Sequence, residues 1–218
     1  MQRIIQTTAD GSPTIAIPDM QVTYHSRHGA VQESRHVFIQ AGLIPFLKQY
    51  SKLRIFEMGF GTGLNALLTL EQAIAHEQTI FYEAVEHFPL NDNEIKDLAY
   101  NSLSTPEYFD VLHQCKWNEP VTIHPFFTLY KNNISLQKFN ATESFHLIYY
   151  DAFAPAAQPE LWTLQIFEQL YNMLINDGVL VTYCSKGDVR RNMLAAGFKV
   201  EKLAGPPGKR EMLRAIKH

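Results

Sequence analysis

The chain has 218 residues, 46% of them hydrophobic, and a formal net charge of −3. This length is enough for one domain with a sizeable core, and the small net charge does not indicate a nucleic-acid partner for the molecule as a whole. The sequence has no apolar run of about 18 residues, no signal-peptide pattern, and too few cysteines for a disulfide framework. We therefore expect a cytoplasmic protein with no membrane partner.

Residues 1–50 are expected to form an N-terminal extension that packs on the same domain as residues 51–218. Within the extension, residues 15–17 and 22–24 suggest short strands. Ser34 is of a residue type that caps helices, and we expect it to begin a helix. This helix would carry three apolar side chains, Val37, Phe38 and Ile39.

From residue 53 onward, short apolar runs alternate with helical patterns. Strands are predicted at residues 53–58, 79–85, 145–150 and 178–184, and helices at residues 63–77 and 160–175. Residues 198–203 and 211–216 could add two edge strands, whereas residues 91–139 show no clear pattern. Because strands that alternate with helices form a parallel sheet covered on both faces, we predict an α/β, Rossmann-like fold with a mostly parallel sheet.

A glycine-rich turn follows the first of these strands, in the segment 57–65 (EMGFGTGLN). Its spacing is G-x-G-x-G, whereas dinucleotide-binding proteins have G-x-G-x-x-G, which aims a helix N-terminus at a pyrophosphate. S-adenosylmethionine has no phosphate but carries an ammonium and a sulfonium group, and an acid at the strand end, Glu57, suits such a ligand. We therefore predict S-adenosylmethionine as the cofactor. The predicted contacts in this turn are Glu57, Gly59, Phe60, Gly61, Gly63 and Asn65.

A second acid, Glu86, stands at the end of the next predicted strand. At this place a carboxylate can accept both ribose hydroxyls of an adenosine. NAD and S-adenosylmethionine share that ribose, so Glu86 does not separate them. We include Glu86 and the adjacent His87 among the predicted cofactor contacts.

The segment 151–155 (DAFAP) follows the strand predicted at residues 145–150, and ligands of open α/β sheets bind beyond the carboxyl ends of strands. The segment is similar to the loop of amino-group methyltransferases, in which a carboxylate orients the amine and an aromatic ring can stack on a base. We predict that Asp151 is the catalytic residue, also in contact with the cofactor, and that Phe153 and Pro155 contact the substrate. The alternative is that Asp151 caps a loop while Phe153 packs in the core.

Charge is unevenly distributed along the chain. Residues 186–218 carry a net charge of +6, which leaves −9 for the rest. Such a basic end can bind phosphates, but it can also be an ordinary solvated surface. The nine histidines show no metal-ligand spacing with cysteines or acids, so no metal site is predicted.

Taken in order, these motifs resemble the methyltransferase domain of the bacterial tRNA 5-methylaminomethyl-2-thiouridine methyltransferases, which modify the wobble uridine. The resemblance covers most of the chain and implies a stand-alone class I methyltransferase domain, with any oxidase acting upstream as a separate protein. The segments that carry it are Glu33-Ser34 with Val37-Phe38, EMGFGTGLN, EHFPL at 86–90, DAFAP with PELW at 159–162, Val189-Arg190-Arg191, Ala196-Gly197-Phe198, and GKREM at 208–212.

The resemblance implies S-adenosylmethionine-dependent N-methylation of the 5-aminomethyl group of (2-thio)uridine at the tRNA wobble position. The basic segment and the family motifs coincide at four residues that would contact tRNA: Arg190, Arg191, Lys209 and Arg210. The chain also departs from the family. His87 and residues 156–158 stand where the family often has a lysine, and residues 132–135 lack the Gly-Asp pair that usually holds the adenine. Backbone groups or an Asn amide could hold the adenine instead.

The role of Asp151 depends on its pKa. The attacking amine must be neutral, and its pKa of about 10 exceeds that of an ordinary carboxylate, about 4, by about six units or roughly 8 kcal/mol. We therefore expect Asp151 mainly to orient the amine, with general-base action as the alternative.

Two other classes of function stay open. One is another Rossmann-like enzyme: an NAD-dependent oxidoreductase, a different methyltransferase, or an aminopropyltransferase-like enzyme acting on a small amine. The other is a non-catalytic RNA-binding relative. The G-x-G-x-G spacing argues against the oxidoreductase, and the basic C-terminal segment and the DAFAP loop argue against the aminopropyltransferase-like enzyme. The intact acids Glu57, Glu86 and Asp151 argue against the non-catalytic relative.

Overall fold

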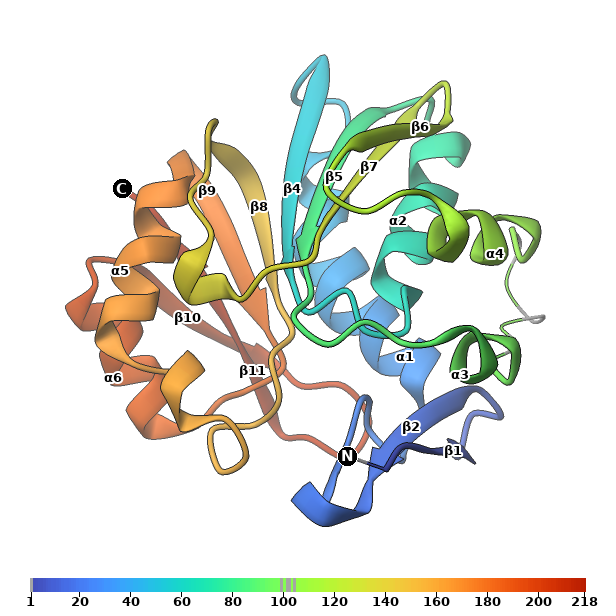
Figure 1. Ribbon diagram of the computed structural model, residues 1–218. Helices are drawn as coiled ribbons and strands as arrows, with labels where there is room; N and C mark the ends of the chain where they lie inside the picture. The colour runs from blue at the N-terminus through green and yellow to red at the C-terminus, as the bar shows by residue number, and fades with distance from the viewer. Residues whose placement is uncertain (1, 99, 101–102, 104) are drawn as a thin grey trace.

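The computed structural model describes residues 2–98, 100, 103 and 105–218. Its centre is an eight-stranded sheet with the order β10-β11-β9-β8-β4-β5-β7-β6 (Figure 1). Five neighbouring strands run parallel to one another: β9 (Leu174–Thr182), β8 (Phe145–Tyr150), β4 (Lys52–Met58), β5 (Thr79–Val85) and β7 (Phe127–Asn132). The predicted α/β fold with a mostly parallel sheet is confirmed.

Antiparallel strands complete both edges of the sheet. On one side, β6 (Pro120–His124) pairs with β7. On the other side, β11 (Glu211–Ile216) pairs with β9, and β10 (Lys199–Ala204) pairs with β11. The prediction that both C-terminal strands are edge strands is wrong for β11, because the hairpin places β11 inside the sheet and only β10 at its edge.

Helices cover both faces of the sheet (Figure 1). One face carries α2 (Leu64–Ala75), α4 (Glu107–Gln114) and the continuous helix formed by α1 (Ala30–Ser34) and the π-helical η2 (Arg35–Leu43). The other face carries α5 (Leu164–Met173) and α6 (Gly187–Ala195). The remaining helices are the short α3 (Asp92–Lys96) and the 3-10 turns η1 (Pro18–Met20), η3 (Ile44–Phe46), η4 (Leu136–Lys138) and η5 (Pro159–Leu161).

The apolar runs of the central strands explain this layered arrangement. In β8, Leu147 and Tyr149 face the core beneath α2, whereas Ile148 and Tyr150 face the core beneath α5. Successive side chains of a strand point to opposite faces, so a strand buried on both faces has to be apolar throughout. The strands predicted at residues 79–85, 145–150 and 211–216 have the bounds that the structure gives.

Two local predictions are wrong. The first helix begins at Ala30 after Gly29, and Ser34 lies inside it with helical backbone angles, so Ser34 is not its cap. The predicted helix at 160–175 ends at Met173, and β9 begins at the next residue, four residues before the predicted strand. In both places the apolar pattern indicated an element but not where it begins or ends.

A small antiparallel sheet, β1 (Ile4–Thr7), β2 (Pro13–Ile17) and β3 (Val22–Thr23), lies beyond the carboxyl ends of the central parallel strands (Figure 1). The following helix buries Val37, Phe38 and Leu43 in the same core as the central strands. The division of the chain at residue 50 stays a prediction. Among the described residues, no helix has the length and apolarity needed to cross a membrane.

Candidate active site

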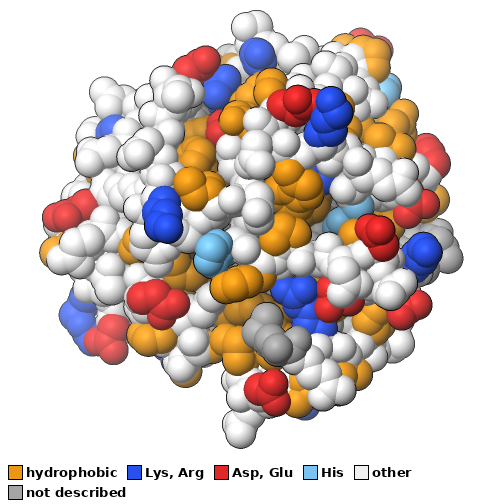
Figure 2. Space-filling view, in the orientation of Figure 1, with side chains coloured by type: hydrophobic (Ala, Val, Ile, Leu, Met, Phe, Trp, Pro, Cys, Tyr) orange, Lys and Arg blue, Asp and Glu red, His pale blue; other side chains and the backbone are white. Residues whose placement is uncertain are grey.

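A cavity of about 290 Å³ opens where β4, β5 and β8 end. In the sheet, β4 lies between β5 and β8: the chain passes from β4 to β5 on one side and later returns to the other side as β8. The cavity therefore lies at the point where the strand order reverses, which is the usual ligand site of open α/β sheets. Its wall combines the loops after β4, β5, β7 and β8 with the N-terminal segment. Figure 2 shows apolar side chains gathered near the centre of this face, with acidic and basic side chains around them.

The glycine turn forms one wall of the cavity. Gly59 and Gly61 have positive φ angles of 89° and 51°, and both line the cavity. A Cβ at Gly59 would lie 3.3 Å from the carbonyl oxygen of Asp151, and a Cβ at Gly61 would lie 3.2 Å from the Tyr24 ring. Glycine is required here because the turn passes close to both the loop that carries Asp151 and the N-terminal segment. Phe60 also lines the cavity, whereas Gly63 begins α2 outside the lining.

A single amide joins the two acids predicted for this region. Asn65 Nδ2 donates to Glu57 Oε1 at 2.9 Å and to Asp151 Oδ2 at 3.0 Å. Asn65 and Asp151 line the cavity, but Glu57 lies behind Asn65 and does not. Burial raises the pKa of Glu57 well above its usual range, the hydrogen bond from Asn65 lowers it, and the charge of Asp151 raises it further. Glu57 therefore acts on the cavity through Asn65.

Asp151 differs from the ordinary carboxylate assumed from the sequence. Burial raises its pKa to about 7, with a further rise from the charge of Glu33, while the hydrogen bond from Asn65 and the charge of Lys209 lower it. The premise of a pKa near 4 is therefore wrong, because the folded chain encloses this carboxyl group. The mismatch with an amine falls to about three units, or about 4 kcal/mol. General-base action by Asp151 thus becomes chemically accessible.

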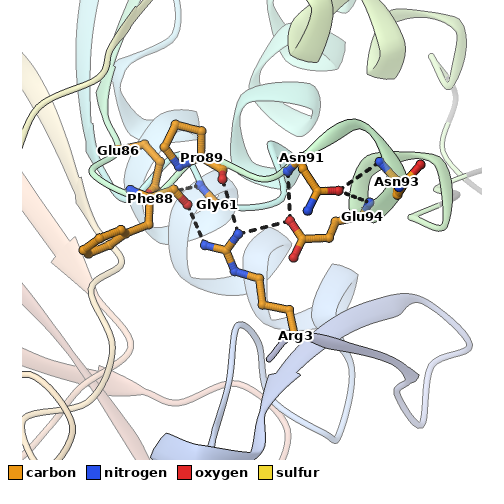
Figure 3. A network of polar contacts seen from close by, with 8 residues as sticks. All are labelled: Arg3, Gly61, Glu86, Phe88, Pro89, Asn91, Asn93 and Glu94. Atoms are coloured by element: carbon orange, nitrogen blue, oxygen red, sulfur yellow. Dashed lines mark hydrogen bonds and ion pairs between the residues drawn. The ribbon is translucent and has the colours of Figure 1, made fainter. Parts of the chain in front are cut away.

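Glu86 lies at the cavity wall and ties two loops together. Its Oε2 accepts from the backbone N–H of Gly61 at 3.1 Å, and its Oε1 accepts from the N–H of Phe88 at 2.8 Å (Figure 3). Each carboxylate oxygen can accept a second hydrogen bond, so both remain able to receive a ribose hydroxyl. His87 lines the cavity beside Glu86, and its ring lies 4.3 Å from that of Phe88.

The N-terminal segment supplies a wall that sequence reasoning missed. Arg3 donates to the carbonyl oxygens of Phe88 and Pro89 and pairs with Glu94 at 3.1 Å (Figure 3). Tyr24 borders the cavity and meets the Phe153 ring edge-on, with 5.1 Å between ring centres. The alternation at residues 22–24 predicted a strand here, but nothing local indicated its neighbours, because they lie far along the chain.

The loop after β8 gives a mixed result for the predicted substrate contacts. Phe153 lines the cavity, while Pro155 does not. The carbonyl oxygen of Phe153 accepts from the Trp162 indole N–H at 2.8 Å, so the PELW segment fixes this loop. That segment also contributes Glu160 and Leu161 to the cavity wall.

The loop after β7 is the candidate site for the adenine. Asn132 donates its amide to Glu83, and Asn133 donates its amide to the carbonyl oxygen of Glu86, so neither amide faces the cavity wall. The wall here is formed by residues 134–137, among them Ser135 and Gln137. These residues follow directly on the segment in which the Gly-Asp pair is missing.

None of the four basic residues predicted to contact tRNA lines the cavity. Arg190 and Arg191 lie on α6, and Arg191 pairs with Asp188 on the surface. Lys209 and Arg210 lie in the turn between β10 and β11, where Lys209 pairs with Glu33 at 2.5 Å and Arg210 is exposed. The four residues therefore lie in different surroundings, although the sequence analysis predicted one role for all of them.

The cavity fits the predicted cofactor. Asn65 Oδ1 is buried at its wall and has no hydrogen-bond partner within the described residues, so it can accept from an ammonium group. Glu86 offers two acceptor oxygens on the neighbouring wall. The described part of the chain shows no group of three or more His, Cys, Asp or Glu side chains that could hold a metal ion.

Comparisons with known proteins show which family the chain resembles. Residues 100–218 match a family described as S-adenosyl-L-methionine-dependent methyltransferase. The tRNA 5-methylaminomethyl-2-thiouridine biosynthesis bifunctional protein MnmC of Pseudoalteromonas atlantica is 33% identical over 97% of this chain but over 33% of its own length. This chain thus spans about a third of the length of such relatives. The matches confirm the resemblance that the motifs indicated.

Solved structures match as well. The crystal structure of MnmC2 from Aquifex aeolicus aligns with 98% of this chain and 70% of that chain, with a TM-score of 0.79 and 25% identity. Spermidine synthase from Thermotoga maritima aligns with 99% of this chain and 68% of its own, with a TM-score of 0.57 and 14% identity, which shows a shared fold alone.

Proposed function

The chain belongs to the family of S-adenosyl-L-methionine-dependent methyltransferases, and from this premise we propose that it methylates the primary amine of 5-aminomethyl-(2-thio)uridine at the tRNA wobble position. S-adenosylmethionine, when bound, supplies an electrophilic methyl group. The observation that carries the proposal is Asp151, a carboxyl group with a pKa raised to about 7 by burial, at the wall of the cavity where β4, β5 and β8 end. The name of the MnmC relative indicates the tRNA substrate.

In this proposal Asp151 holds the amine against the methyl group. Its carboxylate accepts an N–H bond from the neutral amine and directs the nitrogen lone pair. As the new N–C bond forms and the S–C bond breaks, the nitrogen must lose a proton, and Asp151 or a water molecule takes it. Alignment of two reactants in this way can lower the barrier by several kcal/mol. Phe153 and Tyr24, which meet edge-on at the wall, would contact the base.

The cofactor would lie between the glycine turn and the loop after β5. Gly59 and Gly61 let the backbone approach it, Asn65 Oδ1 would accept from its ammonium group, and Glu86 would accept from its ribose. We propose that residues 134–137 hold the adenine. Glu57 would act through Asn65, and its neighbouring acid charge favours a cationic ligand at this wall.

The tRNA would contact the basic C-terminal part of the chain. Arg210 is exposed and Arg190 is half-buried on α6, so both can approach phosphates, which position RNA without reading its sequence. Arg191 could exchange its surface ion pair with Asp188 for a phosphate at little cost, because exposed pairs contribute about 0–1 kcal/mol.

A separate oxidase and a cytoplasmic location complete the proposal. The relatives are named bifunctional, and this chain aligns with about a third of their length. We assign the step that exposes the aminomethyl group to an oxidase outside the aligned residues. Its product would be the substrate here, and we place both steps in the cytoplasm.

Two titrations and one transfer assay test the proposed function. Calorimetry should show binding of S-adenosylmethionine and none of NAD. Incubation with S-adenosylmethionine and tRNA that carries 5-aminomethyl-2-thiouridine should add one methyl group, detected by mass spectrometry of the wobble nucleoside. Transfer to spermidine-like small amines but not to tRNA would favour the small-amine alternative. Binding of tRNA without any methyl transfer would favour the non-catalytic one.

A further inference from the structure

Three side chains join the β10–β11 turn to the loop that carries Asp151. We call Glu33, Tyr183 and Lys209 the brace. Lys209 Nζ lies 2.5 Å from Glu33 Oε1 and 3.8 Å from the centre of the Tyr183 ring. The Tyr183 hydroxyl donates to the carbonyl oxygen of Ala152 at 2.9 Å. The first helix, the end of β9 and the C-terminal hairpin therefore meet at the residue next to Asp151.

Neighbouring contacts hold the brace residues in place. The Glu33 side chain is 8% exposed, and its second oxygen accepts from the Ser26 N–H at 2.7 Å. Gly208, which precedes Lys209, has a φ of +84°, and a Cβ there would lie 2.1 Å from the His28 ring. The turn is thus packed directly against the N-terminal segment. If Lys209 moved away to a phosphate, the Glu33 carboxylate would stay buried without its cation, which is unfavourable.

Arg210 provides the contrast within the same turn. It carries the same charge as Lys209 and is the next residue, yet its side chain is exposed. The structure therefore gives two adjacent cations different surroundings. One is fixed among the brace residues, and the other is free to meet a partner in solution.

The two charges of the brace act on Asp151 in opposite directions. The negative charge of Glu33 raises the pKa of Asp151, and the positive charge of Lys209 lowers it. Other groups also face this carboxyl: Asn65 from α2 donates to it, Glu57 from β4 and Tyr82 from β5 interact with its charge, and so does Tyr183 after β9. Of these, only the brace residues carry an ion pair of opposite charges.

We propose that Glu33, Tyr183 and Lys209 position the catalytic loop, and that Lys209 balances the charge of Glu33, so that neither charge alone shifts how tightly Asp151 holds its proton. Lys209 then acts in the methyl-transfer step by positioning the loop, and RNA is bound by Arg210 and by α6. This inference rests on the proposed function for the role of Asp151, but the proton affinity of that carboxyl can be measured without any substrate.

The first experiment is a ¹³C NMR titration of the Asp151 carboxyl carbon, identified by its loss in Asp151→Asn. Glu33→Gln removes the negative charge and leaves Lys209, so the titration midpoint should fall by roughly 0.5–1 unit, a modest value for a nearby charge. Glu33→Gln combined with Lys209→Met removes both charges and should bring the midpoint back toward that of the wild type. Arg210→Met is the matched control and should leave the midpoint unchanged.

The second experiment measures tRNA binding against salt and single-turnover methyl transfer against pH. Arg210→Met should reduce the slope of log affinity against log salt by about one, the value for one lost phosphate contact. The double variant Glu33→Gln with Lys209→Met should have the same salt slope as Glu33→Gln alone. The midpoint of the pH–rate profile should move with the NMR midpoint, a response that a merely structural role would not produce. Lys209→Arg, which keeps the charge, should retain most of the rate.

The outcomes separate the two proposals. If the midpoint of Asp151 is the same in all variants while Lys209→Met flattens the salt slope, Lys209 is a phosphate contact and the brace has no role in the site. If the midpoints shift as expected but the wild type methylates no tRNA, the brace stands and the proposed substrate is wrong. Circular dichroism shows whether each variant is folded, and Glu33→Gln alone suffices if the double variant is not.

Discussion

Asp151→Asn should change stability in a way that depends on pH. The pKa of Asp151 is raised from 3.8 to about 7, mainly by burial. A carboxyl group with a raised pKa binds its proton more tightly in the folded state than in the unfolded state. Its favourable contribution is therefore fully present below the unfolded pKa, near 4, and is lost as the pH rises through 7. Asn keeps the shape and stays neutral, so the variant should escape this loss.

The size of the effect follows from the shift. About three pKa units at 1.36 kcal/mol each amount to about 4 kcal/mol, an upper bound because Asp151 also contacts the cavity. Between pH 5 and pH 8, about 3 kcal/mol of this contribution should be lost in the wild type. Asp151→Asn should therefore gain stability relative to the wild type by up to that amount over the same range.

Urea unfolding at pH 5.0, 6.5 and 8.0 measures this difference. Asp19→Asn serves as the control for the same chemical change at an exposed position, because Asp19 lies exposed in the turn η1. A difference between wild type and Asp151→Asn that stays constant from pH 5 to pH 8 would show that the carboxyl group is not perturbed. The argument that burial prepares Asp151 to take up a proton would then fail.

Further predictions concern the cofactor, the RNA and catalysis. Glu86→Ala should weaken S-adenosylmethionine binding by about 2–3 kcal/mol in calorimetry, the scale of hydrogen bonds to a charged group, and unchanged affinity would remove Glu86 from the site. Arg3→Ala should weaken it by about 1 kcal/mol, because Arg3 holds the loop that follows Glu86; equal affinity would show that the loop holds itself. Replacing Arg190 and Arg210 by Ala should reduce the salt slope of tRNA binding by about two with cofactor affinity intact, and an unchanged slope would place the RNA surface elsewhere. In single-turnover transfer, Asp151→Asn should keep measurable activity if this residue only orients the amine, whereas Asn and Ala variants should both lose about 10²–10⁴-fold if it is the general base.

The sequence by itself determined the layered sheet and the position of the site. Runs such as FHLIYY at 145–150 are apolar or aromatic at every residue except His146, a pattern typical of a strand buried on both faces. The glycine turn and the acids Glu86 and Asp151 stand at strand ends, and the carboxyl ends of parallel strands meet at one edge. These inferences succeed because they depend on residues that are neighbours along the chain.

Only the tertiary structure decided how those residues behave. The pKa of Asp151 depends on the burial of its carboxyl group and on Glu33, which the chain brings from 118 residues away. Lys209, one of four basic residues that looked alike in sequence, pairs with a carboxylate 176 residues distant. Arg3 reaches the loop after β5 across 85 residues. The burial, ion pairs and hydrogen bonds of a side chain depend on residues that are close in space but distant along the chain. Local sequence patterns could therefore single out these side chains but could not predict what surrounds them.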